Sequence, residues 1–146
     1  DYGKLGHSEA VGVLVPGSKV PEFAEHFFKL FTKKGERVDP QDRGAEYRSV
    51  LGVPGGMLNP QFAVIQKFAD KKGMKLKEGK GNDPDSLGKG VVYVYDSKKF
   101  PFFQAEVYHQ FHNDMVETYS QEYKGLRGQK LESGQIKSTG CPELRV

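Results

Sequence analysis

Short strand patterns alternate with amphipathic helix patterns along this chain, and this alternation constrains its fold most. The run Val91–Tyr95 contains only β-branched and aromatic residues, which is typical of a strand. Residues 9–15 and 47–53 alternate with period two, which predicts two more strands. In segments 21–35 and 60–73 apolar residues recur every three or four positions, as on one face of a helix. These patterns predict an α+β fold, a two-layer α/β sandwich.

Turn-forming residues set the expected boundaries. Gly35 and Gly73 should end the two helices, and Asn59 should cap the second. A third helix is expected over 104–119, a loop over 78–90, and an irregular C-terminal tail from about 124 to 146. No glycine-rich nucleotide fingerprint follows a strand, which argues against a dinucleotide-binding fold.

Length and composition indicate one domain spanning 1–146. The net charge of +3, from 22 basic and 19 acidic residues, offers no electrostatic reason for nucleic acid as a partner. No apolar stretch approaches the roughly 20 residues of a membrane span, and no signal-peptide pattern is present. We therefore expect a soluble chain, and its compartment stays open between cytoplasm and organelle because a removed transit peptide leaves no trace.

Polar residues occur in three stretches, 6–11, 39–49 and 105–110, where packing alone would not require them. Glu9 opens a predicted strand among apolar neighbours, so its carboxylate could be partly desolvated, as a general acid requires. The alternative is a solvated carboxylate at a strand end.

Asp42 and Tyr47 are five residues apart, a spacing that lets a loop carboxylate and a strand phenol turn toward one cleft. A Tyr hydrogen-bonded within the fold is the alternative. Glu106 and His109 have the Glu-x-x-His spacing of carboxylate-bridged metal sites, but those sites need a second such helix. We therefore expect no metal, and a buried His109 bonded to the backbone.

Cys141 is the single cysteine, so neither an intrachain disulfide nor a multi-cysteine zinc site is expected. It lies in the sequence Ser-Thr-Gly-Cys-Pro-Glu, where an exposed thiol could exchange with another thiol or disulfide. A lone cysteine in a tail can equally be incidental.

The three polar stretches together resemble the motifs of the type-A peptide methionine sulfoxide reductase family. Gly-His-Ser-Glu-Ala-Val at 6–11 is similar to the family's Gly-His-Ala-Glu motif. The stretch 39–49, Asp-Pro-Gln-Asp-Arg-Gly-Ala-Glu-Tyr-Arg-Ser, is similar to its Asp-Pro...Asp-x-Gly-x-x-Tyr-Arg-Ser block. The stretch 100–110, Phe-Pro-Phe-Phe-Gln-Ala-Glu-Val-Tyr-His-Gln, is similar to its Phe-x-x-Ala-Glu-x-x-His-Gln segment. The motifs occur in the family's order, and the resemblance implies a ferredoxin-like sandwich with a mixed sheet.

The resemblance implies thiol-dependent reduction of methionine sulfoxide in proteins, with no bound cofactor. A cysteine thiolate attacks the sulfoxide sulfur and becomes a sulfenic acid, which another thiol and then commonly thioredoxin reduce. By motif, Glu9 would be the acid, Tyr47 a catalytic hydroxyl that binds the sulfoxide oxygen, and Asp42 a polar contact to the substrate main chain. Cys141 would be a possible resolving thiol.

The family's Gly-Cys-Phe-Trp-Gly motif, which carries the nucleophile and an apolar wall for the substrate methyl group, should lie before Gly6. Residues 1–146 do not contain it, and they contain no Trp. Without a thiolate, the remaining carboxylates and phenol can orient a sulfoxide but cannot reduce it. Three hypotheses follow. The first is a reductase whose catalytic segment lies outside these residues, and the second is an inactive homologue whose exposed N-terminal side is covered by a partner polypeptide in a larger assembly. The third is a module that only binds oxidised methionine.

Overall fold

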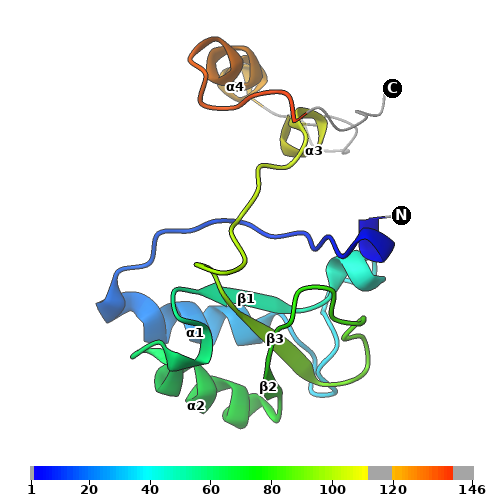
Figure 1. Ribbon diagram of the computed structural model, residues 1–146, viewed down its shortest axis with the longest axis vertical. Helices are drawn as coiled ribbons and strands as arrows, with labels where there is room; N and C mark the ends of the chain where they lie inside the picture. The colour runs from blue at the N-terminus through cyan, green and yellow to red at the C-terminus, as the bar shows by residue number, and fades with distance from the viewer. Residues whose placement is uncertain (1, 112–119, 140–146) are drawn as a thin grey trace. The chain divides into compact units, whose positions relative to one another are not determined.

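A computed structural model describes residues 2–111 and 120–139. The chain divides into two compact units, Asp1–Phe102 and Phe103–Val146, and each is considered by itself. In the first unit a three-stranded sheet has the order β1-β3-β2, with β1 at Val50–Val53, β2 at Lys75–Glu78 and β3 at Val91–Asp96 (Figure 1).

All three strands of this sheet run parallel. Leu51 of β1 lies opposite Val94, and Leu76 of β2 lies opposite Val92. Parallel neighbours need a crossover between them, and the 12 residues 79–90 link β2 to β3. The α+β class expected from the sequence is confirmed, whereas the observed parallel pairing differs from the mixed pairing that was expected.

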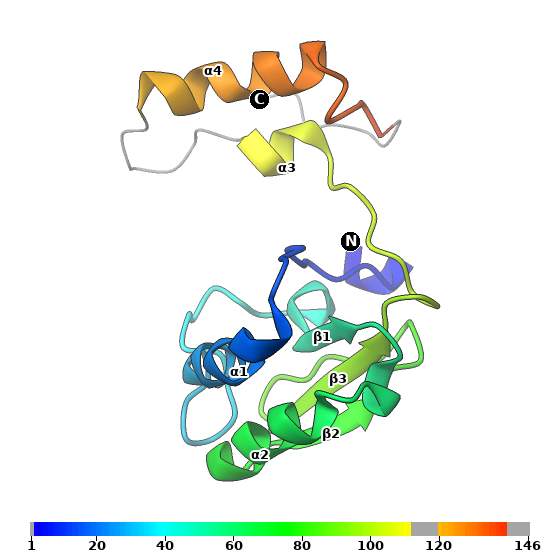
Figure 2. The ribbon, with the colours of Figure 1, turned by 90° about the vertical axis from the view of Figure 1, so that its left-hand side faces the viewer.

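Two helices cover one face of the sheet, α1 at Val20–Lys29 and α2 at Phe62–Lys72 (Figure 2). Their apolar faces pack with residues of all three strands into the main core. The buried members of this core are Ala24, Phe28, Phe31, Leu51, Ile65, Ala69, Met74 and Val92. The opposite face of the sheet holds a smaller cluster, Val91, Tyr93 and Tyr95. The central strand β3 is thus buried on both faces, as its unbroken apolar run indicates.

The second predicted helix ends at Gly73 as expected, but its N-cap residue is Gln61 rather than Asn59, and no side chain caps it. The side chain of Asn59 accepts a hydrogen bond from the Gln61 N–H at 2.8 Å just before α2. Gly73 then ends the helix with a φ of 72°, where its N–H donates to the Ala69 and Asp70 carbonyls. A left-handed residue at this position favours glycine because it has no Cβ.

The strand predicted over 9–15 is wrong. These residues form no strand, and the Val11 and Leu14 side chains are 86% and 101% exposed. Period-two alternation shows that a segment could bury one face in a sheet, but a strand also needs a partner. The opposite error occurs at β2, a lysine-rich stretch for which no strand was predicted. It is an edge strand, where lysines are common because they oppose pairing with another chain.

The second unit contains α3 at Val107–Phe111 and α4 at Gln121–Glu132. The irregular tail expected from residue 124 is therefore wrong over α4. This helix lacks an apolar stripe, so periodicity could not reveal it, but its N-terminus is capped by Ser120, whose hydroxyl accepts from the Tyr123 N–H at 3.2 Å. Of the helix predicted over 104–119, residues 112–119 lie outside the described residues.

In residues 2–111 and 120–139, no helix is long and apolar enough to cross a membrane.

Candidate functional site

The site forms around a short 3-10 turn, Ala45–Tyr47, which ends three residues before β1. Gly44 enters the turn with a φ of 113°, a backbone conformation that L side chains rarely adopt. The Tyr47 N–H then donates to the Gly44 carbonyl at 3.1 Å. Because β1 is fixed in the sheet, the turn holds Tyr47 at a defined place beside the end of that strand.

The N-terminal motif lies against this turn, 37 residues away in sequence. The Glu9 N–H donates to the Glu46 carbonyl at 2.8 Å, and the Ser8 hydroxyl donates to the same carbonyl at 3.3 Å. These bonds bring the first two polar stretches of the sequence together. Glu9 and Tyr47, predicted separately from their motifs, therefore become neighbours.

The pKa of Tyr47 is raised above its usual value, first by the negative charge of Glu9. Burial, the charges of Glu46 and Asp42, and a hydrogen bond to Glu9 raise it further. The Glu9 side chain itself is exposed, so of the two alternatives the solvated carboxylate describes it and the partly desolvated one does not. The phenol thus stays protonated and able to donate at physiological pH.

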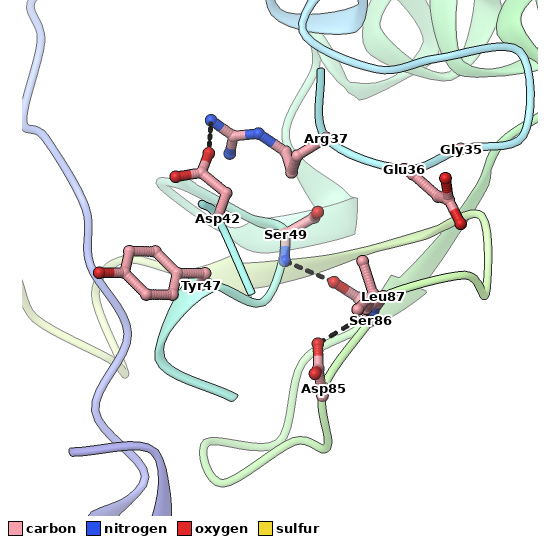
Figure 3. Close-up of a pocket in the computed structure, with 9 residues that line it drawn as sticks. All are labelled: Gly35, Glu36, Arg37, Asp42, Tyr47, Ser49, Asp85, Ser86 and Leu87. Carbon is pink, nitrogen blue, oxygen red and sulfur yellow. Dashed lines mark hydrogen bonds and ion pairs between the residues drawn. The ribbon is translucent and has the colours of Figure 1, made fainter. Parts of the chain in front are cut away.

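Asp42 contributes its charge to this site but already has a partner. Its carboxylate forms an ion pair with the Arg37 guanidinium at 2.8 Å, and both side chains are partly exposed (Figure 3). Arg37 also lies over the Phe31 ring, 5.7 Å from the ring centroid. A substrate amide that binds Asp42 would compete with Arg37 for the same carboxylate.

A small cavity adjoins Tyr47 and Asp42. Its lining residues are Gly35, Glu36, Arg37, Asp42, Tyr47, Ser49, Asp85, Ser86 and Leu87. Its volume of about 10 Å³ is the room of a single water molecule. Figure 3 shows the Tyr47 hydroxyl pointing away from Ser49 and Ser86, toward the N-terminal segment. A side chain as large as methionine sulfoxide therefore cannot enter this cavity and would have to approach the phenol from the Glu9 side.

A wider, open groove shares Arg37 and Asp42 with the small cavity. It has a volume of about 640 Å³, and its lining residues are Leu30, Arg37, Val38, Asp39, Pro40 and Asp42. A peptide lying in the groove would meet Asp42, the residue that the resemblance assigns to the substrate main chain.

Sequence reasoning missed a buried polar network beneath the site. The Tyr95 hydroxyl donates to the Asp83 carboxylate at 2.5 Å and lies 3.1 Å from the Gly81 carbonyl. Asp83 also accepts from the N–H groups of Lys80 and Gly81 at 2.8 and 3.2 Å. Lys80, Gly81 and Asp83 lie in the loop predicted over 78–90, where the only sequence signal was an acidic residue among glycines, and Tyr95 lies in β3.

The network shifts the pKa values of both partners. Burial, followed by the hydrogen bond to Asp83, raises the pKa of Tyr95 to about 12. Burial also acts to raise the pKa of Asp83, but the hydrogen bonds from Tyr95 and from the Lys80 and Gly81 N–H groups outweigh it and lower that pKa. The pair is thus held as a neutral phenol donating to a carboxylate.

The remaining predicted residues lie elsewhere. The third polar stretch, 105–110, lies in the second unit, and the longer motif segment 100–110 runs across the boundary between the two units. His109 is exposed, so the buried histidine that we expected is wrong. In the part of the chain that the structure describes, no cluster of three or more His, Cys, Asp or Glu side chains could hold a metal ion. Cys141 lies outside the described residues.

No model of a protein family, no curated protein and no solved structure matches this chain. The resemblance to the reductase family therefore rests on the three motifs alone.

Proposed function

We propose that residues 1–146 form the acid and oxygen-binding part of a type-A peptide methionine sulfoxide reductase. The contact between Glu9 and Tyr47 carries this proposal, because two motifs distant in sequence meet at their two proposed catalytic residues. The substrate would be methionine sulfoxide in proteins. Thioredoxin or another dithiol would be the reductant.

The proposed chemistry uses the two neighbouring side chains on one oxygen atom. Tyr47, kept neutral by the carboxylates around it, donates a hydrogen bond to the sulfoxide oxygen. A thiolate attacks the sulfur, Glu9 in its protonated form supplies a proton to the oxygen, and the sulfur–oxygen bond breaks. The released hydroxyl oxygen then attacks the cysteine sulfur, the bond between the cysteine and substrate sulfurs breaks, and the products are methionine and a cysteine sulfenic acid. A second thiol then displaces water to form a disulfide, which the dithiol reductant reduces.

In this proposal the attacking thiolate comes from the family's Gly-Cys-Phe-Trp-Gly segment, which is not among residues 1–146. Cys141, the one cysteine present, keeps the role of a possible resolving thiol. Asp42 would hold a substrate amide at the edge of the open groove, in exchange for its ion pair with Arg37.

The test is made on the intact polypeptide purified from its source. Its mass and N-terminal peptide are determined, and reduction of peptides carrying the S or the R epimer of methionine sulfoxide is followed with dithiothreitol. We expect an upstream cysteine, selective reduction of the S epimer, and a kcat lowered about 100-fold by Glu9→Gln. Tyr47→Phe should also lower kcat.

Glu25→Gln is the matched control, since Glu25 is an exposed carboxylate on α1 paired with Lys29 at 3.0 Å. It should leave kcat unchanged. An intact mass of 16.3 kDa together with no reduction of either epimer would refute the proposal.

A second candidate is an inactive homologue that serves as a structural or interaction subunit of a larger assembly. The observation that favours it is the exposed apolar segment 11–14, in which Val11, Val13 and Leu14 are unburied and form no strand. A partner polypeptide that covers this segment would remove apolar surface from water. In this case the native protein should elute with a larger mass than the chain alone, and a Val11→Ser/Leu14→Ser variant should elute as a monomer.

A further inference from the structure

Arg48 is a buried cation beneath the site, with 4% of its surface exposed. Its Nη1 donates to the carbonyls of His7 and Ala45, both at 2.9 Å. Its Nη2 donates to the carbonyls of Gly6 and Gly81 at 2.6 and 3.0 Å. One guanidinium therefore joins three segments that are distant in sequence: the N-terminal motif, the turn that carries Tyr47, and the loop before β3.

These bonds anchor the segment that carries Glu9. On its N-terminal side, Gly6 and His7 are held through their carbonyls to the buried guanidinium. On its C-terminal side, residues 10–14 are exposed and form no strand. Between them, the Ser8 hydroxyl and the Glu9 N–H donate to the Glu46 carbonyl, and the Glu9 side chain is hydrogen-bonded to Tyr47.

Electrostatics work against the placement of Glu9. The charged groups that act on the Tyr47 phenol are the carboxylates of Glu9, Glu46 and Asp42. The Glu9 side chain is hydrogen-bonded to Tyr47, but the Glu46 carboxylate repels its charge. Asp42 repels it too, to the extent that Arg37 leaves the Asp42 charge uncompensated. The bonds from Arg48 to the Gly6 and His7 carbonyls attach the backbone next to Glu9 independently of these side-chain charges.

We propose that Arg48 is a positioning residue that holds Glu9 against Tyr47. Its four hydrogen bonds fix the carbonyls two and three residues before Glu9, and through Ala45 they fix the turn that carries the phenol. The catalytic meaning of this role rests on the proposed function, in which Glu9 and Tyr47 act on the same sulfoxide oxygen.

The first experiment measures the position of Glu9 through the ionisation of Tyr47. The chain is labelled with 13C at the tyrosine ring carbon that bears the hydroxyl, and the Tyr47 signal is assigned with Tyr47→Phe and titrated by NMR. Glu9→Gln should lower the pKa of Tyr47, because the charge that raises it most is removed. Arg48→Lys should also lower it, because a single ammonium keeps the charge but cannot reach four carbonyls.

The double variant Glu9→Gln/Arg48→Lys decides between a positioning role and a general loss of structure. If Arg48 acts through Glu9, the double variant has the same Tyr47 pKa as Glu9→Gln alone. The proposal is overturned if Arg48→Lys leaves the pKa of folded protein unchanged, or if the two substitutions lower it additively.

A second variant keeps the test valid if Arg48→Lys does not fold. Gly6 has a φ of 79°, and a Cβ added there would lie 3.3 Å from the Asn82 side chain, so Gly6→Ala should shift the Gly6 carbonyl without touching Arg48. Gly73→Ala is the matched control, with a φ of 72° and open space around the added Cβ at the end of α2. Gly6→Ala should lower the Tyr47 pKa and Gly73→Ala should not. Equal behaviour of the two variants would refute the positioning role.

Activity of the intact polypeptide separates this proposal from the proposed function. Arg48→Lys should lower the kcat for the S epimer at least about tenfold, because a small misplacement of a reacting group is costly. If neither epimer is reduced but the Tyr47 pKa still follows Arg48, the positioning role stands and the reductase proposal fails. If the S epimer is reduced and Arg48→Lys changes neither kcat nor the Tyr47 pKa, the positioning role fails and the reductase proposal stands.

Discussion

Replacement of Tyr95 by Phe removes one hydroxyl from the buried network and keeps the ring. The lost hydroxyl is the donor to the Asp83 carboxylate at 2.5 Å, and Tyr95 is 9% exposed. A hydrogen bond to a charged group contributes about 1.5–3 kcal/mol, so at pH 7 the free energy of unfolding should fall by about 2 kcal/mol. The packing of the ring against Phe100 is unchanged by this substitution.

The pH dependence is the sharper part of this prediction. The folded-state pKa of Tyr95 is raised from 10.0 to about 12. A raised pKa means that the folded state holds the proton more tightly, so this stabilisation is fully present below pH 10 and is lost as the pH rises toward 12. Two pKa units correspond to about 3 kcal/mol at most. The difference in unfolding free energy between the wild type and Tyr95→Phe should therefore shrink by up to about 1.4 kcal/mol per pH unit in that window.

Urea denaturation followed by far-UV circular dichroism at pH 7, 9, 10, 10.5 and 11 measures this difference, since the chain has no Trp for fluorescence. Other tyrosines and the lysines titrate in both proteins, so their contributions cancel in the difference. Asp83→Asn gives a second comparison. Because this variant lacks the carboxylate that raises the pKa of Tyr95, its unfolding free energy should depend less steeply on pH above 10 than that of the wild type. A difference between the wild type and Tyr95→Phe that stays constant from pH 9 to 11 would refute the reasoning.

Two further substitutions test the packing that supports the site. Gly35→Ala should lower the free energy of unfolding, measured by urea denaturation, by at least about 2 kcal/mol, because the added Cβ would lie 2.5 Å from the Gly90 Cα at a φ of 74°. Gly73→Ala, at a similar φ but with open space around the Cβ, should lower it by about 1 kcal/mol. Equal losses in the two variants would contradict the packing argument. Phe31→Ala should lower the free energy of unfolding by about 3–5 kcal/mol, because Phe31 is fully buried in the main core. Phe102→Ala, at an exposed ring, should change it by no more than about 0.5 kcal/mol. A small loss for Phe31→Ala would contradict the assigned core.

Part of the candidate site could be predicted from motifs. Glu9, Tyr47 and Asp42 were identified by their resemblance to the reductase motifs, and the structure places the charges of Glu9 and Asp42 within reach of the Tyr47 phenol. The sequence could not show that Asp42 is already paired with Arg37. It also could not show that Arg48, which lies inside one of the motifs, reaches the carbonyls of another.

The sequence by itself determined the elements whose signals are local. The helix α2 has the Asn59 turn before it, its apolar stripe and its terminal glycine within 15 residues, and β3 is specified by its unbroken β-branched and aromatic run. The tertiary structure alone decided which extended segments pair. Residues 9–15 have a strand pattern without a partner, whereas the lysine-rich β2 has a partner in β3. The same holds for the site, because the bonds from Arg48 to Gly6 and Gly81 span 42 and 33 residues, and such contacts exist only after the sheet has brought those segments together.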